Sequence, residues 1–238
     1  MILNPLGCII AAALMLFPLG GPGAAAPLPE PAPQWPDTPL ARLSALAIVE
    51  TLNGELLSNE SATATLDAWC AHHRLAADPR IVADRVWGED KPVTAEQRAR
   101  LRVGPEENVR YRRVRLRCGD HVLSEADNWY VPSRLTPDMN RALETSDIAF
   151  GRAVGALHFR RQRLEARLLW HPLPEGWDMG KVGQPAGSGP LAIPAHVIEH
   201  RAILLAGDGT PFSEVVETYT SQILDFPAPS IGGAGRAL

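Results

Sequence analysis

The chain has 238 residues, of which 45% are apolar and 21% are charged. This composition is typical of a globular protein and excludes a disordered or collagen-like chain. The formal net charge of −4 gives no indication of nucleic-acid binding, and we expect none.

The chain begins with a segment typical of an export signal. An apolar run at 9–17 is followed by proline and glycine and then by three alanines at 24–26. This order matches the apolar region and cleavage site of a signal peptide. The run is shorter than the roughly 20 apolar residues of a membrane span. We therefore expect residues 1–26 to be cleaved and the mature protein, without a membrane span, to be periplasmic or secreted. An uncleaved apolar anchor is the alternative.

Composition divides the rest of the chain into three parts. Prolines are dense between Ala26 and Pro39, which is typical of an extended linker and not of a core. The last residues resemble a flexible chain end. The predicted parts are a proline-rich linker at 27–42, a domain at 43–226 and a flexible tail at 227–238.

Helices are predicted early in this domain and between its strands. Residues 40–57 carry apolar residues at helical spacing, with an interruption at Gly54, and residues 59–73 form a second helix. A short helix at 135–146 has Thr136 as its cap.

Hairpins dominate the remainder of the domain. Turn signals occur at Gly119 and at Gly207–Gly209, each between two strand-like stretches, and no β-α-β alternation is visible. We therefore predict an α+β fold in which about six strands form an antiparallel sheet with helices packed on one face. The strand-like stretches are 80–88, 108–117, 121–132, 153–170 and the two arms of 196–224.

The cysteines allow a disulfide or free thiols, and the histidines give no indication of a metal site. After removal of the signal, Cys70 and Cys118 form one disulfide or stay as two buried free thiols. His196 and His200 share one face of a strand, but their spacing spans too far for one ion. We therefore expect no metal site.

Two neighbouring arginines in the strand at 108–117 differ in their surroundings. Alternation places Arg112 among apolar residues and Arg113 among further arginines. A guanidinium on a core face is costly unless it is paired, and its planar fork is suited to a carboxylate. Arg112 is therefore the preferred candidate for binding a carboxylate, and Arg113 remains the second candidate.

The final strand carries two glutamates on opposite faces. Glu217 shares its face with Val215 and Tyr219, whereas Glu214 lies on the other face, where a surface position is expected. A desolvated glutamate can donate a proton near neutral pH. An arginine and Glu217 that line one apolar cavity would together bind a small anionic ligand and move a proton within it. The alternative is an Arg–Glu pair that stabilises the sheet.

Four stretches resemble the chorismate lyase family and the related ligand-binding domains of GntR-type regulators. The similarity extends over roughly residues 52–224. It implies a helix-covered antiparallel sheet that encloses the ligand, no cofactor, and elimination of pyruvate from chorismate to leave 4-hydroxybenzoate. The stretches are 55–69, 112–132, 153–159 and 207–219.

The resemblance also implies roles for single residues. A carboxylate-binding arginine falls on Arg113 when counted from the Val-Pro that ends the next strand, and on Arg112 when the apolar face is matched. The acid of proton transfer falls on Glu217 after a shift of one residue in the turn, with Glu214 as the fallback.

The resemblance further implies two flaps whose backbone contacts the ligand, and these fall on Ala62 and Val154. From the resemblance, the predicted function is a lyase acting on chorismate or a related small carboxylate. Chorismate is made in the cytoplasm, whereas this chain carries an export-type segment. The alternative is therefore a non-catalytic, exported domain that binds a small aromatic acid.

Overall fold

The computed structural model describes residues 34–88, 90–180 and 187–230. All of them belong to one unit that spans residues 32–238. The predicted signal peptide and most of the predicted tail lie outside the described residues. Within the described residues, none of the helices combines the length and the apolar character that crossing a bilayer requires.

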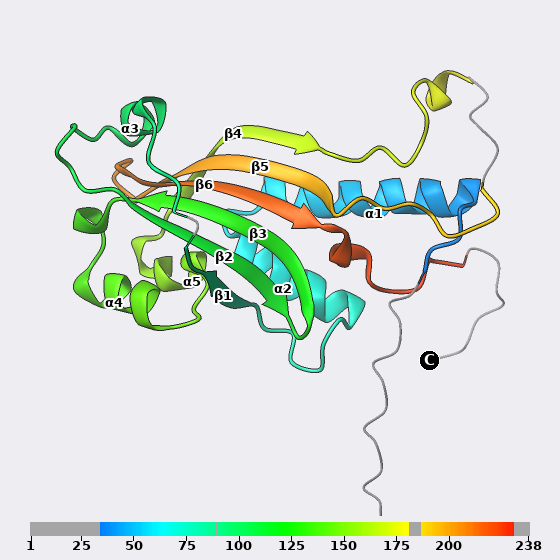
Figure 1. The fold of residues 1–238 in the computed structure, drawn as a ribbon, viewed down its shortest axis with the longest axis horizontal. Coiled ribbons are helices and arrows are strands. Elements are labelled where there is room, and N and C mark those ends of the chain that lie inside the picture. The colour runs from blue at the N-terminus through cyan, green and yellow to red at the C-terminus, as the bar shows by residue number, and fades with distance from the viewer. Residues whose placement is uncertain (1–33, 89, 181–186, 231–238) are drawn as a thin grey trace, which may run out of the picture. The chain divides into compact units, whose positions relative to one another are not determined.

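Six antiparallel strands form one sheet in the order β1-β2-β3-β6-β5-β4 (Figure 1). Two hairpins, β2–β3 and β5–β6, make up its centre, and β3 pairs with β6 to join them. The β5–β6 turn places Gly209 at φ +84°, a conformation that glycine adopts without steric cost. The strands are β1 (Val82–Val86), β2 (Arg110–Cys118), β3 (His121–Tyr130), β4 (Arg160–Leu168), β5 (His196–Leu205) and β6 (Pro211–Thr220).

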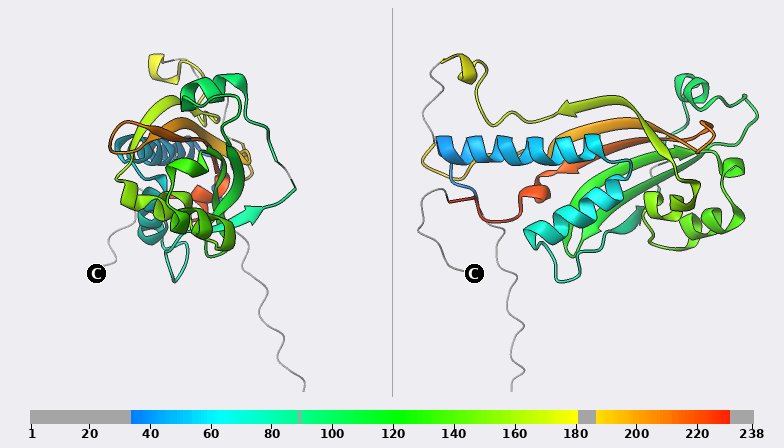
Figure 2. Two further views of the ribbon diagram at one scale, coloured as in Figure 1. Left: turned by 90° about the vertical axis from the view of Figure 1, so that its left-hand side faces the viewer. Right: turned by 180° about the vertical axis from the view of Figure 1, so that it is seen from behind.

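Two helices, α1 and α2, cover one face of the sheet, which we call the covered face (Figures 1 and 2). On the other face, the open face, α3 packs against one end of β6, and the segment before α3 contacts β3 through Lys91. The predicted α+β fold with a six-stranded antiparallel sheet is confirmed. The helices are α1 (Pro39–Ser58), α2 (Ala62–His73), α3 (Ala95–Leu101), α4 (Pro137–Thr145) and α5 (Phe150–Ala153), and short 3-10 turns lie at Pro132–Arg134, Gly155–Leu157, Trp177–Met179 and Ser221–Leu224.

Helix α1 continues through Gly54, so the predicted interruption there is wrong. A glycine inside an exposed helix costs only about 1 kcal/mol relative to alanine. Burial of an apolar stripe against the sheet outweighs that cost, because Val49, Leu52 and Leu56 are all buried.

Helix α3 is absent from the prediction, although its sequence carries a start signal. The Thr94 side chain accepts a hydrogen bond from the backbone N–H of Gln97, and the Gln97 side chain accepts one from the Thr94 N–H. This reciprocal capping box stabilises the first turn of a helix.

The end of the predicted linker is part of the core. Trp35 is 2% exposed, and its indole N–H donates to the carbonyl oxygens of Leu224 and Phe226. Helix α1 begins at Pro39, with the Thr38 side chain as its cap. The proline-rich segment therefore stops being a linker several residues before the predicted boundary at 42.

Cys70 and Cys118 form a disulfide, which decides between the two alternatives that the sequence left open. The bond joins the last turns of α2 to the end of β2 and therefore fastens a covering helix to the sheet.

Candidate functional site

A cavity lies between the covered face of the sheet and the first turns of α2 and α5. Its empty space, open solvent at the mouth included, amounts to about 470 Å³, but only about 30 Å³ of it admits the centre of a water molecule. The enclosed part is therefore small, and a ligand must be small as well. Its charged lining residues come from the segment before α2 and from β2, β4 and β6. They are Glu60, Arg112, Arg161 and Glu217. The apolar wall includes Val114, Leu116, Phe150, Phe159, Leu204 and Val215.

Arg112 is buried at this cavity with little to balance its charge. Its side chain donates to the carbonyl oxygen of Ile148 at 3.0 Å, and its Nε has no hydrogen-bond partner among the described residues. Burial, assisted by the charge of Arg85, lowers the pKa of Arg112 to about 10. No carboxylate within the described ranges forms an ion pair with it. A small anion would supply the missing partner.

Two further donor groups lie at the same cavity. Asn128 is the direct cross-strand neighbour of Arg112, and its side-chain oxygen accepts the Ser213 hydroxyl at 2.6 Å. The Asn128 oxygen is thereby directed at Ser213, and the amide NH₂ group can donate to other partners. The first turn of α2, with Ala62 and Thr63 at the cavity, has backbone N–H groups that the helix itself does not use.

Glu217 is also buried at the cavity, but it already has a partner. Arg161 of β4 forms an ion pair with its carboxylate, and the Tyr219 hydroxyl donates to the same oxygen at 3.3 Å. Burial is the largest single influence and lowers the pKa of Arg161, but Glu217, Tyr219 and Glu60 together raise it above its usual value. Glu217 therefore acts as the counter-ion of a buried arginine in this structure.

A second layer of polar groups supports this pair. His200, on β5 directly opposite Glu217, lies 2.8 Å from the side-chain oxygen of Asn53 on α1. Burial lowers the pKa of His200 to about 4, so the ring is neutral at pH 7. Burial and the neighbouring Glu217 raise the pKa of Tyr219 well above its usual range, so this residue stays a hydrogen-bond donor.

The two predicted flap residues have different positions. Ala62 lines the cavity, whereas Val154 is fully buried at the end of α5 and is not among the lining residues. Gly151 lies there instead. A Cβ atom at Gly151 would come within 3.2 Å of the hydroxyl oxygens of Ser61 and Thr63, so glycine lets α5 approach α2 closely.

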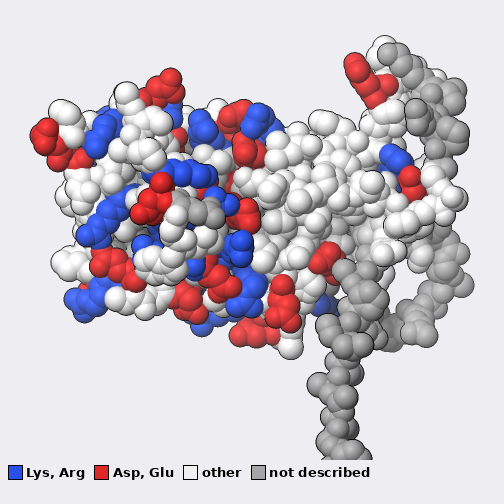
Figure 3. Space-filling view, viewed as in Figure 1, with Lys and Arg blue, Asp and Glu red and all other residues white. Residues whose placement is uncertain are grey.

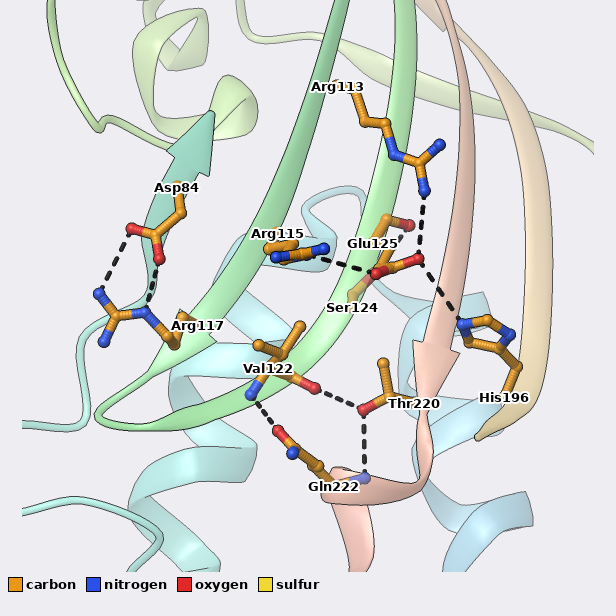
Figure 4. A network of polar contacts seen from close by, with 10 residues as sticks. All are labelled: Asp84, Arg113, Arg115, Arg117, Val122, Ser124, Glu125, His196, Thr220 and Gln222. Atoms are coloured by element: carbon orange, nitrogen blue, oxygen red, sulfur yellow. Dashed lines mark hydrogen bonds and ion pairs between the residues drawn. The ribbon is translucent and has the colours of Figure 1, made fainter. Parts of the chain in front are cut away.

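Arg113 lies on the open face and does not reach the cavity. Figure 4 shows Arg113 and Arg115 directed at Glu125, with His196 on the other side of the same carboxylate. Figure 3 shows basic and acidic residues intermingled over this face. The strand pleat therefore separates the two candidate arginines, and Arg113 is no longer a candidate for the carboxylate clamp.

Glu214 is not the surface residue that its face predicts. It is 0% exposed, because Arg100 of α3 binds both of its carboxylate oxygens at 2.8 Å. The helix missing from the prediction therefore buries Glu214. Since Glu214 lies on the open face, it is also excluded from the cavity.

The two histidines of β5 do not share a face. The register of β5 against β6 shifts between His196 and Ile198, which puts His196 on the open face and His200 on the covered face. Residues 34–88, 90–180 and 187–230 contain no cluster of three or more His, Cys, Asp or Glu suited to a metal ion.

Arg161 and Asn128 were not among the sequence-predicted site residues. Arg161 is one of several arginines in β4, most of them exposed, and nothing local distinguishes it from Arg160 or Arg163. Its burial depends on pairing with Glu217 of a strand that is distant in sequence. Asn128 lies opposite Arg112 only because the hairpin register shifts between Leu116 and Arg117, and pairing counted from the turn would have put Asp127 there.

A protein of Sinorhizobium fredii, the uncharacterized protein y4mC, is 60% identical to this chain over 197 residues. The alignment covers 82% of this chain and 83% of that protein. No family model matches the chain.

The structure of this chain is also partly similar to solved structures of transcriptional regulators. The effector domain of PhnF from Mycobacterium smegmatis has a TM-score of 0.44 at 10% identity, covering 68% of this chain and 89% of that one. A GntR-family regulator from Enterococcus faecalis has a TM-score of 0.38 at 12% identity, and the alignment covers 62% of this chain and 99% of that one. The possible transcriptional regulator YydK from Bacillus subtilis has a TM-score of 0.35 at 15% identity. The alignment covers 63% of this chain, and this chain spans 62% of the length of that one. Similarities at this level do not decide the function.

Proposed function

The chain belongs to the family of the Sinorhizobium fredii protein y4mC, and we propose that it binds a small organic acid in the cavity lined by Arg112. The observation that carries this proposal is a buried guanidinium whose Nε has no hydrogen-bond partner and which forms no ion pair with any described residue. Such a charge is costly in a folded protein, and a ligand carboxylate offsets that cost.

The donor groups around Arg112 fit one carboxylate. The Asn128 amide lies across the strand pair, and the first turn of α2 adds N–H groups and the positive end of a helix dipole. A carboxylate has about four lone-pair positions, which these groups can satisfy together.

The remaining wall fits an apolar or aromatic body. Phe150 and Phe159 contribute aromatic rings, and Val114, Leu204 and Val215 contribute aliphatic surface. A planar ring bearing one carboxylate combines an apolar body with an anionic end. Small aromatic acids are therefore the proposed ligand class.

We propose that the protein acts outside the cytoplasm. The N-terminal sequence has the order of a cleaved export signal, although that segment lies outside the described residues. The disulfide between Cys70 and Cys118 supports the same compartment, because disulfides persist in oxidising environments.

A lyase acting on chorismate or a related carboxylate is the second candidate. The observation in its favour is that Arg112 and Glu217 line one cavity. The ion pair with Arg161 weighs against it, because it engages the carboxylate that would have to transfer a proton. We therefore rank non-catalytic binding first.

Calorimetric titration with benzoate tests the binding function. Arg112→Met should weaken binding at least about thirtyfold, because the ligand charge loses its buried partner. Arg113→Met is the matched control and should bind as the wild type does, since Arg113 lies on the open face. Equal losses in both variants, or no binding by the wild type, would contradict the proposal.

A pyruvate assay tests the second candidate. Mature protein is incubated with chorismate beside the Glu217→Gln variant. Release of pyruvate by the wild type and its loss in the variant would favour the lyase. Release that the substitution does not change would remove Glu217 from the mechanism.

A further inference from the structure

The two arginines at the cavity differ in whether the protein itself neutralises them. Arg161 is 9% exposed and paired with Glu217, which is 6% exposed. Arg112, at 2% exposure, has no acidic partner among the described residues. Of the two cations at the cavity, Arg161 is therefore neutralised by the protein, whereas Arg112 has no ion pair within the described ranges. The second acid of the lining, Glu60, is exposed and accepts the backbone N–H of Arg161.

The Arg161–Glu217 pair is held in place from several sides. The Tyr219 hydroxyl donates to the Glu217 carboxylate, and the backbone N–H of Arg161 donates to the Glu60 side chain. His200, facing Glu217 from β5, stays neutral at pH 7 and adds no charge. A ligand group could take the place of Glu217 on Arg161 only by leaving a buried carboxylate without its counter-ion.

We propose that the cavity selects its ligand by charge number: it accepts acids with one negative charge and rejects dianions, because Glu217 already occupies Arg161. This inference rests on the proposed binding function and specifies its ligand class. Glu217 is then a specificity-determining residue and not an acid catalyst. The end of the ligand away from Arg112 carries a neutral group.

The same geometry disfavours a cationic group at that end. Glu217 would have to leave Arg161 to pair with a ligand ammonium group, and the freed guanidinium would lie close to the new cation. An amino acid or other zwitterion is therefore rejected for the same reason as a dianion. Neutral hydroxyl or amide groups remain compatible with the polar lining.

Two ligands of equal shape test the inference without any mutation. Isophthalate carries two carboxylates on one ring, and 3-carbamoylbenzoate replaces one of them by a neutral amide of the same size. We expect wild-type protein to bind the amide at least about tenfold more tightly than the diacid, because like charges brought together in a buried site are repelled. Calorimetry at pH 7 gives both dissociation constants, with benzoate as the reference.

Each outcome has a distinct meaning. Equal or tighter binding of isophthalate overturns the inference and leaves the proposed function standing. Binding of benzoate with rejection of both larger ligands also overturns it, because size and not charge then decides. Failure of all three ligands to bind contradicts the proposed function itself and the inference with it.

Glu217→Gln sharpens the test, because it frees Arg161 for a second carboxylate. The preference should then reverse, so that isophthalate binds more tightly than the amide. Ligand-induced shifts of the melting temperature give a second readout, since this variant is expected to be less stable. Tyr219→Phe is the matched control, because it removes a hydrogen bond to Glu217 but keeps the ion pair and should keep the wild-type preference.

Chorismate is itself a dicarboxylate, so the two candidate functions make opposite predictions. A chorismate lyase must accept two carboxylates, whereas the proposed selection by charge number, which we call the charge rule, excludes a ligand with two. Competition between chorismate and 3-carbamoylbenzoate for wild-type protein therefore tests both. Displacement of the amide by an equal concentration of chorismate would overturn the charge rule.

Discussion

The two faces of the sheet use the same residue types for different purposes. On the open face, Arg113 shares Glu125 with Arg115, and these side chains are between 23% and 55% exposed. On the covered face, Arg112 and the Arg161–Glu217 pair are almost sealed from solvent. Arg112 and Arg113 are adjacent in sequence, yet only one of them is at the cavity.

The contrast shows that burial, and not residue type, decides what these charges do. In water, an arginine is solvated whether or not it meets a carboxylate, so an exposed pair is worth little. Inside the protein, a charge without a partner is costly, and a ligand of opposite charge would offset that cost. The following experiments compare the two faces on this basis.

The largest contrast is expected between two Glu→Gln substitutions. Glu217→Gln leaves Arg161 buried without a counter-ion and should lower the free energy of unfolding by about 3 to 5 kcal/mol. Glu125→Gln, on the open face, should change it by less than about 1 kcal/mol. Urea denaturation at pH 7 measures both. Similar losses in the two variants would mean that the faces do not differ as described.

The disulfide fastens α2 to the covered face, and its removal should loosen that side of the sheet. It closes a loop with a sequence separation of 48. Replacing Cys70 and Cys118 together by alanine should lower the free energy of unfolding by about 4 kcal/mol on the chain-entropy model. The double variant should not respond to a reducing agent, which separates loss of the bond from other effects. If the reducing agent left the free energy of unfolding of the wild type unchanged as well, the disulfide would be contradicted.

The buried histidine should make stability depend on pH. The pKa of His200 is about 4 in the folded protein, against its ordinary value of 6.5. Between these values the unfolded chain binds a proton that the folded chain does not, so stability falls as pH drops from 6.5 to 4. The expected loss from this group is about 3 kcal/mol.

Denaturation curves at several pH values check this expectation. His200→Gln should remove that part of the pH dependence, because glutamine can still donate to Asn53 but does not titrate. His196→Gln, on the open face, is the control and should retain the wild-type profile. A His200 variant with an unchanged profile would place the titrating group elsewhere.

The smallest predicted effect has the opposite sign. Arg112→Met removes a buried charge that forms no ion pair with a described residue and should raise the free energy of unfolding by about 1 kcal/mol in the absence of ligand. Arg113→Met should bring no such gain. A stabilised variant that no longer binds benzoate would show that Arg112 is kept for binding at the expense of stability.

Much of the fold and part of the site could be predicted from local patterns. Strand alternation separated Arg112 from Arg113 and Glu217 from Glu214, and the turn glycines located both hairpins. Such features depend only on neighbours along the chain. The bulge near His196 escaped this approach, because one extra residue reverses the faces and leaves no clear mark in the sequence.

By itself, the sequence determined which residues share a face of β2 and of β6, and therefore that one arginine and one glutamate could share a cavity. Only the tertiary structure decided their partners. It brought Arg161 from β4 to Glu217 and Arg100 from α3 to Glu214, and within the described part of the chain it gave Arg112 no ion pair. The physical reason is that burial and ion pairing depend on contacts between segments far apart in sequence, which no local period records.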